Sequence, residues 1–508
     1  ATAGIVSATT LFGDGSNLTG IALSIAPLNY NPAVYGVDLA HSTGIGLTFN
    51  QAIKAGSGEV TLRITGAGGT VVQNWGVGSS ITYGKSSYGD TISLSLVSDL
   101  SNDTVYHLSY PSGAFTNTGG DVSYVGTAYT FDSKINVNQL FYWGAQTYGK
   151  FGLNNRTWYS SPVQLPGTTW ERIDIGWQGT SEGGHSIATK SDGTLWTWGE
   201  NVNGSLGHNN RTNRSSPVQV PGTTWTKVIS AGRMNSQAIK TDNTLWTWGQ
   251  NDEGHLGHNN KNVHYSSPTQ VPGTWSVVNT SYSVMMGVRT NGTLWAWGSN
   301  DSGQLGKNSN VKYSSPVQIG SATDWSTSGA GKIYIDYTAA AIKTDGTLWM
   351  WGGNGQGSLA QNNTTQRSSP VQVPGTTWRS ISNVSNGTIA SKTDGTLWSW
   401  GQNTNGQLGQ NDETAYSSPT QIPGTWSGVI GGGVYHVLAT KTDGTLWAWG
   451  ENEGGELAQN MGPGSGSSGL FSSPVQIGSS TGWSTTVGDQ KISGGIFGGF
   501  SSAAILYD

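Results

Sequence analysis

The chain of 508 residues is only 10% charged but contains 77 Gly and 23 Trp. Because disordered chains are poor in aromatic residues, this composition indicates an all-β protein with many tight turns. The net charge of −5 gives no reason to expect nucleic acid or an anionic membrane as a partner, no stretch approaches the roughly 18 apolar residues of a membrane-spanning helix, and the absence of Cys excludes disulfides, thiolate zinc sites and cysteine nucleophiles.

Residues 1–21 are predicted to form an N-terminal attachment segment or linker. The chain begins at Ala1 with neither Met nor a charged-then-apolar leader, so we expect a processed chain or a segment of a longer one. Residues 10–21 read TLFGDGSNLTGI, which resembles a phrase common in tail-fibre and other structural proteins of marine bacteriophages. The resemblance implies a virion appendage, and the alternative is a plain Gly-rich linker.

Residues 22–135 are predicted to form a separate β-sandwich domain. Segments of alternating polarity, such as 59–64 and 91–96, are separated by turn residues at a spacing typical of sandwiches. The progression from residues 47–53 to residues 129–131 resembles the bacterial Ig-like domains of surface-layer and adhesin proteins. This resemblance implies an Ig-like β-sandwich that acts as a spacer.

Residues 136–508 contain a sevenfold repeat, marked three times over. A Trp-Gly step recurs at intervals of 49 to 55 residues, with its Trp at Trp143, Trp198, Trp248, Trp297, Trp351, Trp400 and Trp449. A Ser-Ser-Pro step recurs with Pro162, Pro217, Pro268, Pro316, Pro370, Pro419 and Pro474. A further Trp follows Pro-Gly-Thr or a variant of it, at Trp170, Trp225, Trp275, Trp325, Trp378, Trp426 and Trp483.

Within each repeat the sequence predicts a β-hairpin. Residues 238–248 read AIKTDNTLWTW, two β segments around a two-residue turn that is Asp-Gly in most copies. Asp-Gly favours a type I′ turn, in which both central residues have positive φ. Trp246 and Trp248 share one face of their strand. Since each Trp buries about 150–250 Å², such pairs are predicted to form the core between neighbouring sheets, and the alternative is a sugar-stacking platform.

The two ends of the repeat region are predicted to complete one sheet. Residues 502–508 match the first strand of the hairpin, and the missing second strand stands at residues 139–144. The expected fold is therefore all-β, an Ig-like sandwich followed by a seven-bladed β-propeller that is closed by the N- and C-terminal strands of the repeat region. Closure removes the exposed sheet edges that an open array would leave.

The repeat resembles a known family. Residues 245–257 follow the pattern Leu-Trp-x-Trp-Gly-x-Asn-x-x-Gly-x-Leu-Gly, and His185 and His436 match a His-containing turn; both features are similar to the regulator of chromosome condensation repeat. The resemblance covers residues 136–508 and implies a β-propeller. It implies less about function, because propellers of this family include nucleotide exchange factors, secreted enzyme inhibitors and virion or surface proteins.

The residue directly before the Ser-Ser-Pro step is aromatic or Arg in all seven repeats. These residue types are enriched in binding hot spots, so the position is a candidate ligand-binding ring, and the alternative is that each side chain packs on a neighbouring blade. The loops before it differ most between repeats, with an insertion from Met461 to Leu470, and such loops often carry recognition. The candidates are Tyr159, Arg214, Tyr265, Tyr313, Arg367, Tyr416 and Phe471.

No catalytic residue, metal or cofactor is predicted. His208 and His258 occupy one position in adjacent repeats, about one blade apart, and His255 and His264 lie near the second; this spacing is too wide for one tetrahedral metal site. His185 and His436 are expected to donate hydrogen bonds within turns. Several carboxylates are expected to be solvated loop charges, the alternative being a glycosidase pair: Glu200, Asp252, Glu253, Asp301, Glu451, Glu453 and Glu456.

These features predict a non-enzymatic structural and receptor-recognition protein of a phage tail or capsid fibre, exposed on the virion surface. Its N-terminal region is expected to bind other virion or surface-assembly proteins, and its propeller loops a host surface glycan or protein. The alternatives are a bacterial cell-surface or secreted adhesin and an inhibitor-like propeller. A polysaccharide depolymerase is the enzymatic alternative, and it needs a carboxylate pair that the sequence does not display.

Overall fold

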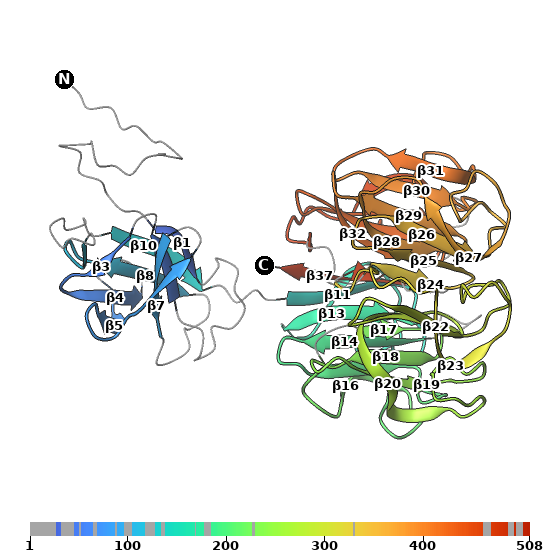
Figure 1. The fold of residues 1–508 in the computed structure, drawn as a ribbon, viewed down its shortest axis with the longest axis horizontal. Coiled ribbons are helices and arrows are strands. Elements are labelled where there is room, and N and C mark those ends of the chain that lie inside the picture. The colour runs from blue at the N-terminus through green and yellow to red at the C-terminus, as the bar shows by residue number, and fades with distance from the viewer. Residues whose placement is uncertain are drawn as a thin grey trace. The chain divides into compact units, whose positions relative to one another are not determined.

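The computed structural model describes residues 27–31, 45–49, 52–64, 69–86, 89–95, 104–116, 127–133, 138–167, 169–176, 184–225, 229–328, 331–460, 469–485, 492–493 and 501–507. The predicted attachment segment 1–21 and residues 461–468 of the predicted insertion lie outside these residues. Every secondary-structure element assigned in the described residues is a β-strand. The chain separates into two compact units, Ala1–Asn136 and Val137–Asp508 (Figure 1).

The first unit contains two four-stranded antiparallel sheets and one short pair of strands. Val60, Leu62 and Leu108 of one sheet share a buried cluster with Ile92 and Leu94 of the other, so the two sheets pack through their inner side chains. The strand orders are β1(Pro27–Asn31)-β2(Ile45–Phe49)-β7(Gly89–Leu94)-β6(Thr82–Ser86), β10(Thr127–Ser133)-β8(Thr104–Tyr110)-β4(Glu59–Ile64)-β5(Val71–Gly76) and β3(Lys54–Ala55)-β9(Phe115–Thr116).

The repeat unit contains five four-stranded sheets and one seven-stranded sheet among its described residues. The first three in the chain are β12(Tyr159–Leu165)-β11(Asn138–Gly144)-β37(Ser501–Tyr507)-β36(Ile492–Ser493), β13(Trp170–Ile175)-β14(His185–Lys190)-β15(Leu195–Gly199)-β16(Arg214–Val220) and β17(Ile229–Ala231)-β18(Asn235–Ile239)-β19(Thr244–Gly249)-β20(Tyr265–Thr280)-β21(Val284–Arg289)-β22(Leu294–Gly298)-β23(Tyr313–Gln318). The others are β24(Ile333–Ile335)-β25(Thr338–Ile342)-β26(Leu348–Gly352)-β27(Arg367–Val373), β28(Trp378–Val384)-β29(Gly387–Lys392)-β30(Leu397–Gly401)-β31(Tyr416–Ile422) and β32(Trp426–Gly432)-β33(His436–Lys441)-β34(Leu446–Glu451)-β35(Leu470–Gln476).

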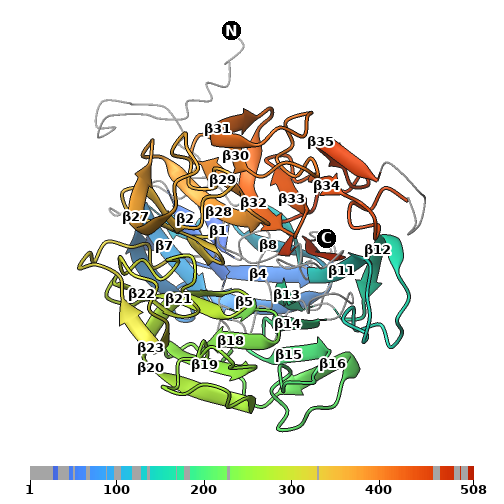
Figure 2. The same cartoon turned by 90° about the vertical axis from the view of Figure 1, so that its right-hand side faces the viewer.

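The four strands of a sheet are called its first, second, third and fourth strands. In the sheet β13-β14-β15-β16 they are β13, β14, β15 and β16, and the other sheets have equivalent strands. The seven-stranded sheet joins two such sets, because the long strand β20 is the fourth strand of one set and continues as the first strand of the next. In Figure 2 the sets follow one another around a centre, with fourth strands such as β16, β27 and β31 at the periphery and first strands such as β13, β28 and β32 further in.

The two ends of the repeat region share one sheet. β11 pairs with β37 in an antiparallel register that places Asn138 opposite Tyr507 and Phe141 opposite Ala504. The first strands touch in succession: β13 with β17, β17 with β20, β20 with β24, β24 with β28, β28 with β32, β32 with β36, and β36 with β13. The contacts between first strands therefore return to the strand from which they start.

The Trp of the Trp-Gly step joins each sheet to the loop of the preceding one. Its side chain is fully buried in all seven repeats. In five repeats its indole N–H donates to a main-chain carbonyl in the preceding repeat's third-to-fourth loop, over 2.7 to 2.9 Å. The pairs are Trp143 with Glu456, Trp248 with Ser205, Trp351 with Gln304, Trp400 with Ser358 and Trp449 with Gln407.

First-strand side chains cap the edge of the neighbouring sheet. A first strand forms one edge of its sheet, so its outward N–H groups need partners from elsewhere. The same strand position supplies the acceptor in four repeats: Asp174 for the N–H of Ala231, Ser230 for Thr280, Asn279 for Ile335 and Ser382 for Gly432.

The turn between second and third strands differs from the predicted type I′ turn. Only the Gly has positive φ, 78° at Gly193; the N–H of Gly193 bonds to the carbonyl of Lys190, and the N–H of Lys190 to the carbonyl of Thr194. This geometry is a three-residue loop with a bulge at Gly. Asp192 favours it because its Oδ1 accepts both the N–H and the hydroxyl of Thr194.

Six of the seven repeats carry another Trp two residues before the Trp of the Trp-Gly step, and this Trp faces the turn and is only half-buried. Trp246 donates its indole N–H to the Thr244 hydroxyl over 2.9 Å. The Lys240 ammonium lies 4.3 Å from the ring centroid of Trp246 and 4.5 Å from that of Trp225, a cation–π arrangement. A Lys or Arg occupies this position in six repeats: Lys190, Lys240, Arg289, Lys343, Lys392 and Lys441. The Trp pair is thus divided between the core and a half-exposed cation site.

Replacing Trp143 tests whether the sheet formed by the two ends of the repeat unit packs on the preceding sheet as firmly as the other sheets pack on theirs. Trp143→Ala is expected to lower the free energy of unfolding of the repeat unit by about 3–5 kcal/mol, as for a buried Trp in a continuous core. Trp400→Ala is the matched control at a junction within the chain. Urea unfolding followed by fluorescence measures both variants. A cost for Trp143→Ala far below that of Trp400→Ala would contradict an equivalent junction.

Candidate functional site

The turns between first and second strands and the loops between third and fourth strands lie on the same side of the repeat unit, which we call the loop face. Alternating antiparallel strands place both connections at the same end of each sheet. A main-chain hydrogen bond joins them within a repeat, from the N–H of Gln250 to the carbonyl of Met234 and from the N–H of Gly353 to the carbonyl of Tyr337.

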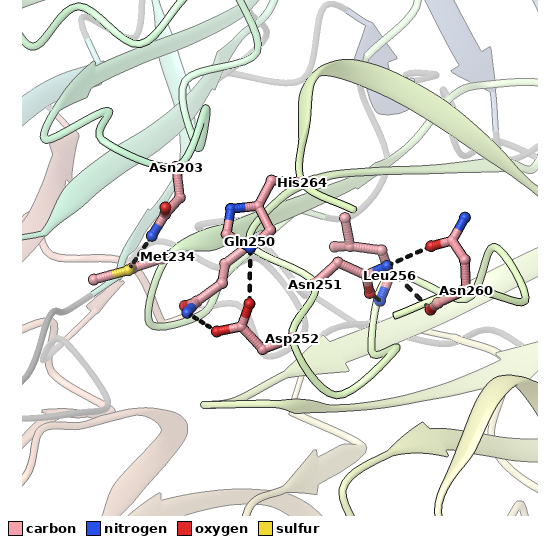
Figure 3. A network of polar contacts seen from close by, with 8 residues as sticks. All are labelled: Asn203, Met234, Gln250, Asn251, Asp252, Leu256, Asn260 and His264. Carbon is pink, nitrogen blue, oxygen red and sulfur yellow. Dashed lines mark hydrogen bonds and ion pairs between the residues drawn. The ribbon is translucent and has the colours of Figure 1, made fainter. Parts of the chain in front are cut away.

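A buried amide holds each third-to-fourth loop in shape. The Oδ1 of Asn251 accepts the N–H of Leu256 over 2.9 Å, and its Nδ2 donates to the carbonyl and side-chain oxygens of Asn260 (Figure 3). Equivalent Asn residues make the same bond to the Leu five positions later. They are Asn201, Asn300, Asn354, Asn403 and Asn452. The loops therefore form a preorganised support for the residues that vary between repeats.

The Gly of the Trp-Gly step explains how the loop can begin so close to the neighbouring turn. Gly249 has a φ of 101°, a conformation that residues with a side chain rarely adopt. A Cβ at this position would lie 2.3 Å from the carbonyl oxygen of Met234. Gly is therefore needed where the loop leaves the third strand.

The predicted aromatic and Arg ring occupies one register position. Each of its members lies opposite the Gly of the Trp-Gly step, where the fourth strand begins, as Tyr265 lies opposite Gly249. Arg367 is exposed and the other members are half-buried. The seven residues are Tyr159, Arg214, Tyr265, Tyr313, Arg367, Tyr416 and Phe471.

The tyrosines of this ring pack on the core. Tyr265, Tyr313 and Tyr416 each lie against two buried clusters. The Tyr416 hydroxyl donates to Asp412 over 2.7 Å, and the Tyr265 hydroxyl accepts a hydrogen bond from Asn260 over 2.8 Å. These contacts favour the packing alternative, and ligand binding at the ring stays a prediction.

The exposed apolar residues of the repeat unit lie elsewhere, on the loop face. Val202, Val263 and Val311 belong to third-to-fourth loops, whereas Tyr282 and Tyr337 belong to first-to-second turns. Tyr282 is 42% exposed and Tyr337 is 55% exposed. In the described part of the repeat unit, these five are the large hydrophobic side chains that remain exposed.

Arg233, Tyr282 and Tyr337 stand on three successive first-to-second turns, and we call them the Tyr–Arg cluster. The Arg233 guanidinium lies 4.1 Å from the ring centroid of Tyr282. Burial lowers the pKa of Arg233, while the charges of Asp252 and Tyr337 act in the opposite direction. The Ser281 hydroxyl donates to Asp336 over 2.9 Å and so joins the two turns that carry the tyrosines.

Sequence reasoning missed this cluster, although a signal was present. The two residues before each second strand change completely between repeats, from Arg233-Met234 to Tyr282-Ser283, Asp336-Tyr337 and Ser385-Asn386. Aligning the repeats on the second strand would have brought these pairs into one column.

The expectation that His185 and His436 bond within their turns is wrong. The Nε2 of His185 pairs with the Ser236 hydroxyl over 2.7 Å, and that of His436 with the Ser502 hydroxyl over 3.0 Å, so both bonds cross to the next sheet. Burial lowers the pKa of His185 to about 4 and that of His436 to about 3. Both rings are structural links in the core.

Three further histidines of the repeat unit bond to side chains of their own repeats. His208 and His258 each contact a Thr hydroxyl of the third strand over 3.0 Å, and His264 pairs with Asp252 over 2.7 Å (Figure 3). His255 is buried. Within the described residues, His, Asp and Glu form no group of three that could hold a metal ion.

The expectation of solvated loop carboxylates is wrong for two residues. Glu456 is fully buried and Glu200 is 5% exposed, because both side chains point into the packed base of their loops. The Glu456 carboxylate accepts the N–H of Gly454 over 2.8 Å. Burial, reinforced by nearby Glu451 and Glu453, raises the pKa of Glu456 to about 8.

Comparison with known families and structures identifies the repeat. The model of the regulator of chromosome condensation (RCC1) repeat matches residues 192–239, 242–282, 291–331 and 394–439, and a second RCC1 repeat model matches residues 378–407. The chain contains RCC1 repeats. This finding confirms the resemblance to the RCC1 repeat in the matched residues.

Solved structures of RCC1-type β-propellers resemble the repeat unit. Prp20p from Saccharomyces cerevisiae, described with its binding to Gsp1p and histones, has a TM-score of 0.60 and 18% identity over 73% of this chain and 92% of that chain. Human WBSCR16 has a TM-score of 0.59 and 18% identity over 73% of this chain and 98% of that chain. Yeast RCC1 (Prp20) bound to Kap60 has a TM-score of 0.60 and 18% identity over 73% and 89%. At this identity the likeness concerns the fold.

The described residues contain no helix long and apolar enough to cross a membrane.

Packing of the aromatic ring leads to a stability prediction. Tyr416→Ala is expected to lower the free energy of unfolding by about 2 kcal/mol, because it removes a half-buried aromatic contact. Arg367→Ala, the exposed equivalent, is expected to change it by less than about 0.5 kcal/mol. Thermal and urea unfolding measure both. Unchanged stability of Tyr416→Ala together with lost ligand binding would instead favour the ligand-binding ring.

The buried Glu456 predicts a pH dependence. An unfolded Glu has a pKa near about 4.3, so between this value and the folded pKa of about 8 the folded chain binds the extra proton and its stability falls as the pH rises. Glu456→Gln removes this loss, and its stability relative to the native chain is expected to increase from pH 5 to pH 8.5. Glu413→Gln, which replaces an exposed carboxylate in another repeat, is the control. A difference between Glu456→Gln and the native chain that is the same at both pH values would contradict the prediction.

Proposed function

We propose that the repeat unit is a closed seven-bladed β-propeller and that the first unit is an Ig-like β-sandwich. The pairing of β11 with β37, the bond from Trp143 to the Glu456 carbonyl and the return of the first-strand contacts to β13 support closure. Two packed antiparallel sheets in residues 27–133 support the sandwich.

We further propose a non-enzymatic recognition protein that binds a surface glycan or protein through its loop face. The observation that carries this proposal is the gathering of exposed apolar residues on that face, over loops held by buried Asn side chains. Exposed aromatic residues on a rigid support are typical of binding surfaces. The buried His185 and His436 and the carboxylate of Asp252 are engaged in structural bonds rather than aligned on one reactive centre.

The assembly that carries the chain is proposed to be a phage tail or capsid fibre, with residues 1–21 as the attachment segment. The support is the phrase at residues 10–21 together with a spacer-like first unit. The alternative is a bacterial cell-surface or secreted adhesin with a protein ligand, a possibility supported by the protein partners of Prp20p named above.

Attachment of the purified full chain to bacterial cells tests the proposed function. The labelled chain is expected to bind host cells saturably and to compete with intact virions for the same cells. Release of oligosaccharides from host polysaccharide during incubation would contradict the non-enzymatic assignment. Saturable binding without competition, with the chain found in cell envelopes by mass spectrometry, would favour the adhesin. Failure to bind any cell or surface extract would contradict the recognition function.

A further inference from the structure

The Tyr–Arg cluster presents a guanidinium group whose buried Nε has no hydrogen-bond acceptor among the described residues. The carboxylate that acts on its charge, Asp252, is itself bonded to His264 over 2.7 Å and to Gln250 (Figure 3). Stacking on Tyr282 holds the guanidinium plane in place. A planar, preorganised guanidinium is suited to bind a carboxylate through two parallel hydrogen bonds.

The tyrosines beside Arg233 supply flat surfaces at fixed positions. Tyr282 and Tyr337 project from separate turns and remain 42% and 55% exposed. The hydrogen bond between Ser281 and Asp336 joins these two turns. Tyr rings provide large contact areas at little cost in conformational entropy. Their faces match the apolar C–H face of a pyranose ring.

The surroundings favour a carbohydrate over an extended peptide. Amide side chains lie beside the turn that carries Arg233, since Asn203 contacts the sulfur of the next residue, Met234, and the main-chain N–H of Gln250 bonds to the carbonyl of Met234 (Figure 3). Amides both donate to and accept from hydroxyl groups. An extended peptide usually binds by adding a strand to an open sheet edge. At the neighbouring first strands, that edge is capped at Ala231 and Ile335 by side chains of adjacent sheets.

We infer that the Tyr–Arg cluster is a subsite for an acidic glycan, in which Arg233 binds the carboxylate of a sugar acid and Tyr282 and Tyr337 stack on its rings. This inference rests on the proposed recognition function and names the site and chemical class of its ligand. The exposed Val263 and Val311 of the third-to-fourth loops are not part of the subsite.

Titration of the full chain with defined oligosaccharides tests the subsite. The probes are oligomers of galacturonic, glucuronic and sialic acid, the same oligomers after reduction of their carboxyl groups, and poly-glutamate as the acidic peptide. The native chain is expected to bind at least one acidic oligomer and to bind its reduced form about tenfold or more weakly, as for loss of a charge-assisted hydrogen bond.

Variants separate the roles of the three residues. Arg233→Gln is expected to lose about tenfold in affinity for the acidic oligomer and nothing for the reduced one, whereas Tyr337→Ala loses affinity for both. Val311→Ser is the matched control, since it removes an exposed apolar group of the same face. Thermal unfolding is expected to be unchanged in Tyr337→Ala and Val311→Ser, whose altered side chains are exposed. For the half-buried Arg233 the same measurement separates a loss of stability from a loss of affinity.

Three outcomes would overturn the inference. They are equal binding by Arg233→Gln and the native chain, no binding to any acidic oligomer while attachment to cells persists, and Arg233-dependent binding of poly-glutamate instead of sugars. In each of these cases the recognition function stands if the native chain still attaches to cells. Failure of the native chain to attach would contradict the proposed function itself.

Discussion

The bond from a buried indole to a loop carbonyl of the preceding repeat is the interaction on which the repeat unit depends. Each repeat sheet has an apolar face that it cannot bury alone, and the Trp of the Trp-Gly step fills the space between neighbouring sheets. In five repeats the indole N–H of this Trp also bonds to the neighbouring loop. The loop receives its shape from a second interaction, the buried Asn that bonds to the following Leu. Core packing and loop geometry are therefore coupled, and a rigid loop face follows from the same residues that stabilise the core.

Edge protection is the second constraint. First strands would expose unpaired N–H groups toward the centre of the repeat unit, yet side chains such as Asp174 and Asn279 accept these groups from the neighbouring sheet. β37 gives β11 the second-strand partner that a chain without the C-terminal segment would lack. The proposed recognition is then left to the connections, where the half-buried Arg233 and the exposed Tyr282 and Tyr337 lie.

The strands, the RCC1 repeats and the pairing of residues 139–144 with the C-terminal strand could be predicted from the periodicity of the sequence. Seven copies of one pattern outweigh the uncertainty with which any single segment is assigned to a strand. Contacts between repeats were not predictable in the same way. His185 bonds to a Ser 51 positions away, and the burial of Glu456 depends on the neighbouring sheet. The Asp-Gly turn was assigned the wrong type because the Thr that bonds to the Asp carboxylate was overlooked. The Tyr–Arg cluster was missed because its members come from different turns, whereas the ring beginning at Tyr159 was chosen because it recurs.

Amide hydrogen exchange on the full chain tests the proposed closure of the repeat unit most directly. Slow exchange requires that opening be costly, and closure makes β11 and β37 as difficult to open as the internal pair β29 and β30. The account predicts that amides of residues 139–143 and 502–506 are protected to the same degree as those of residues 388–391 and 397–400. Rapid exchange in β11 and β37, with protection retained in β29 and β30, would contradict it.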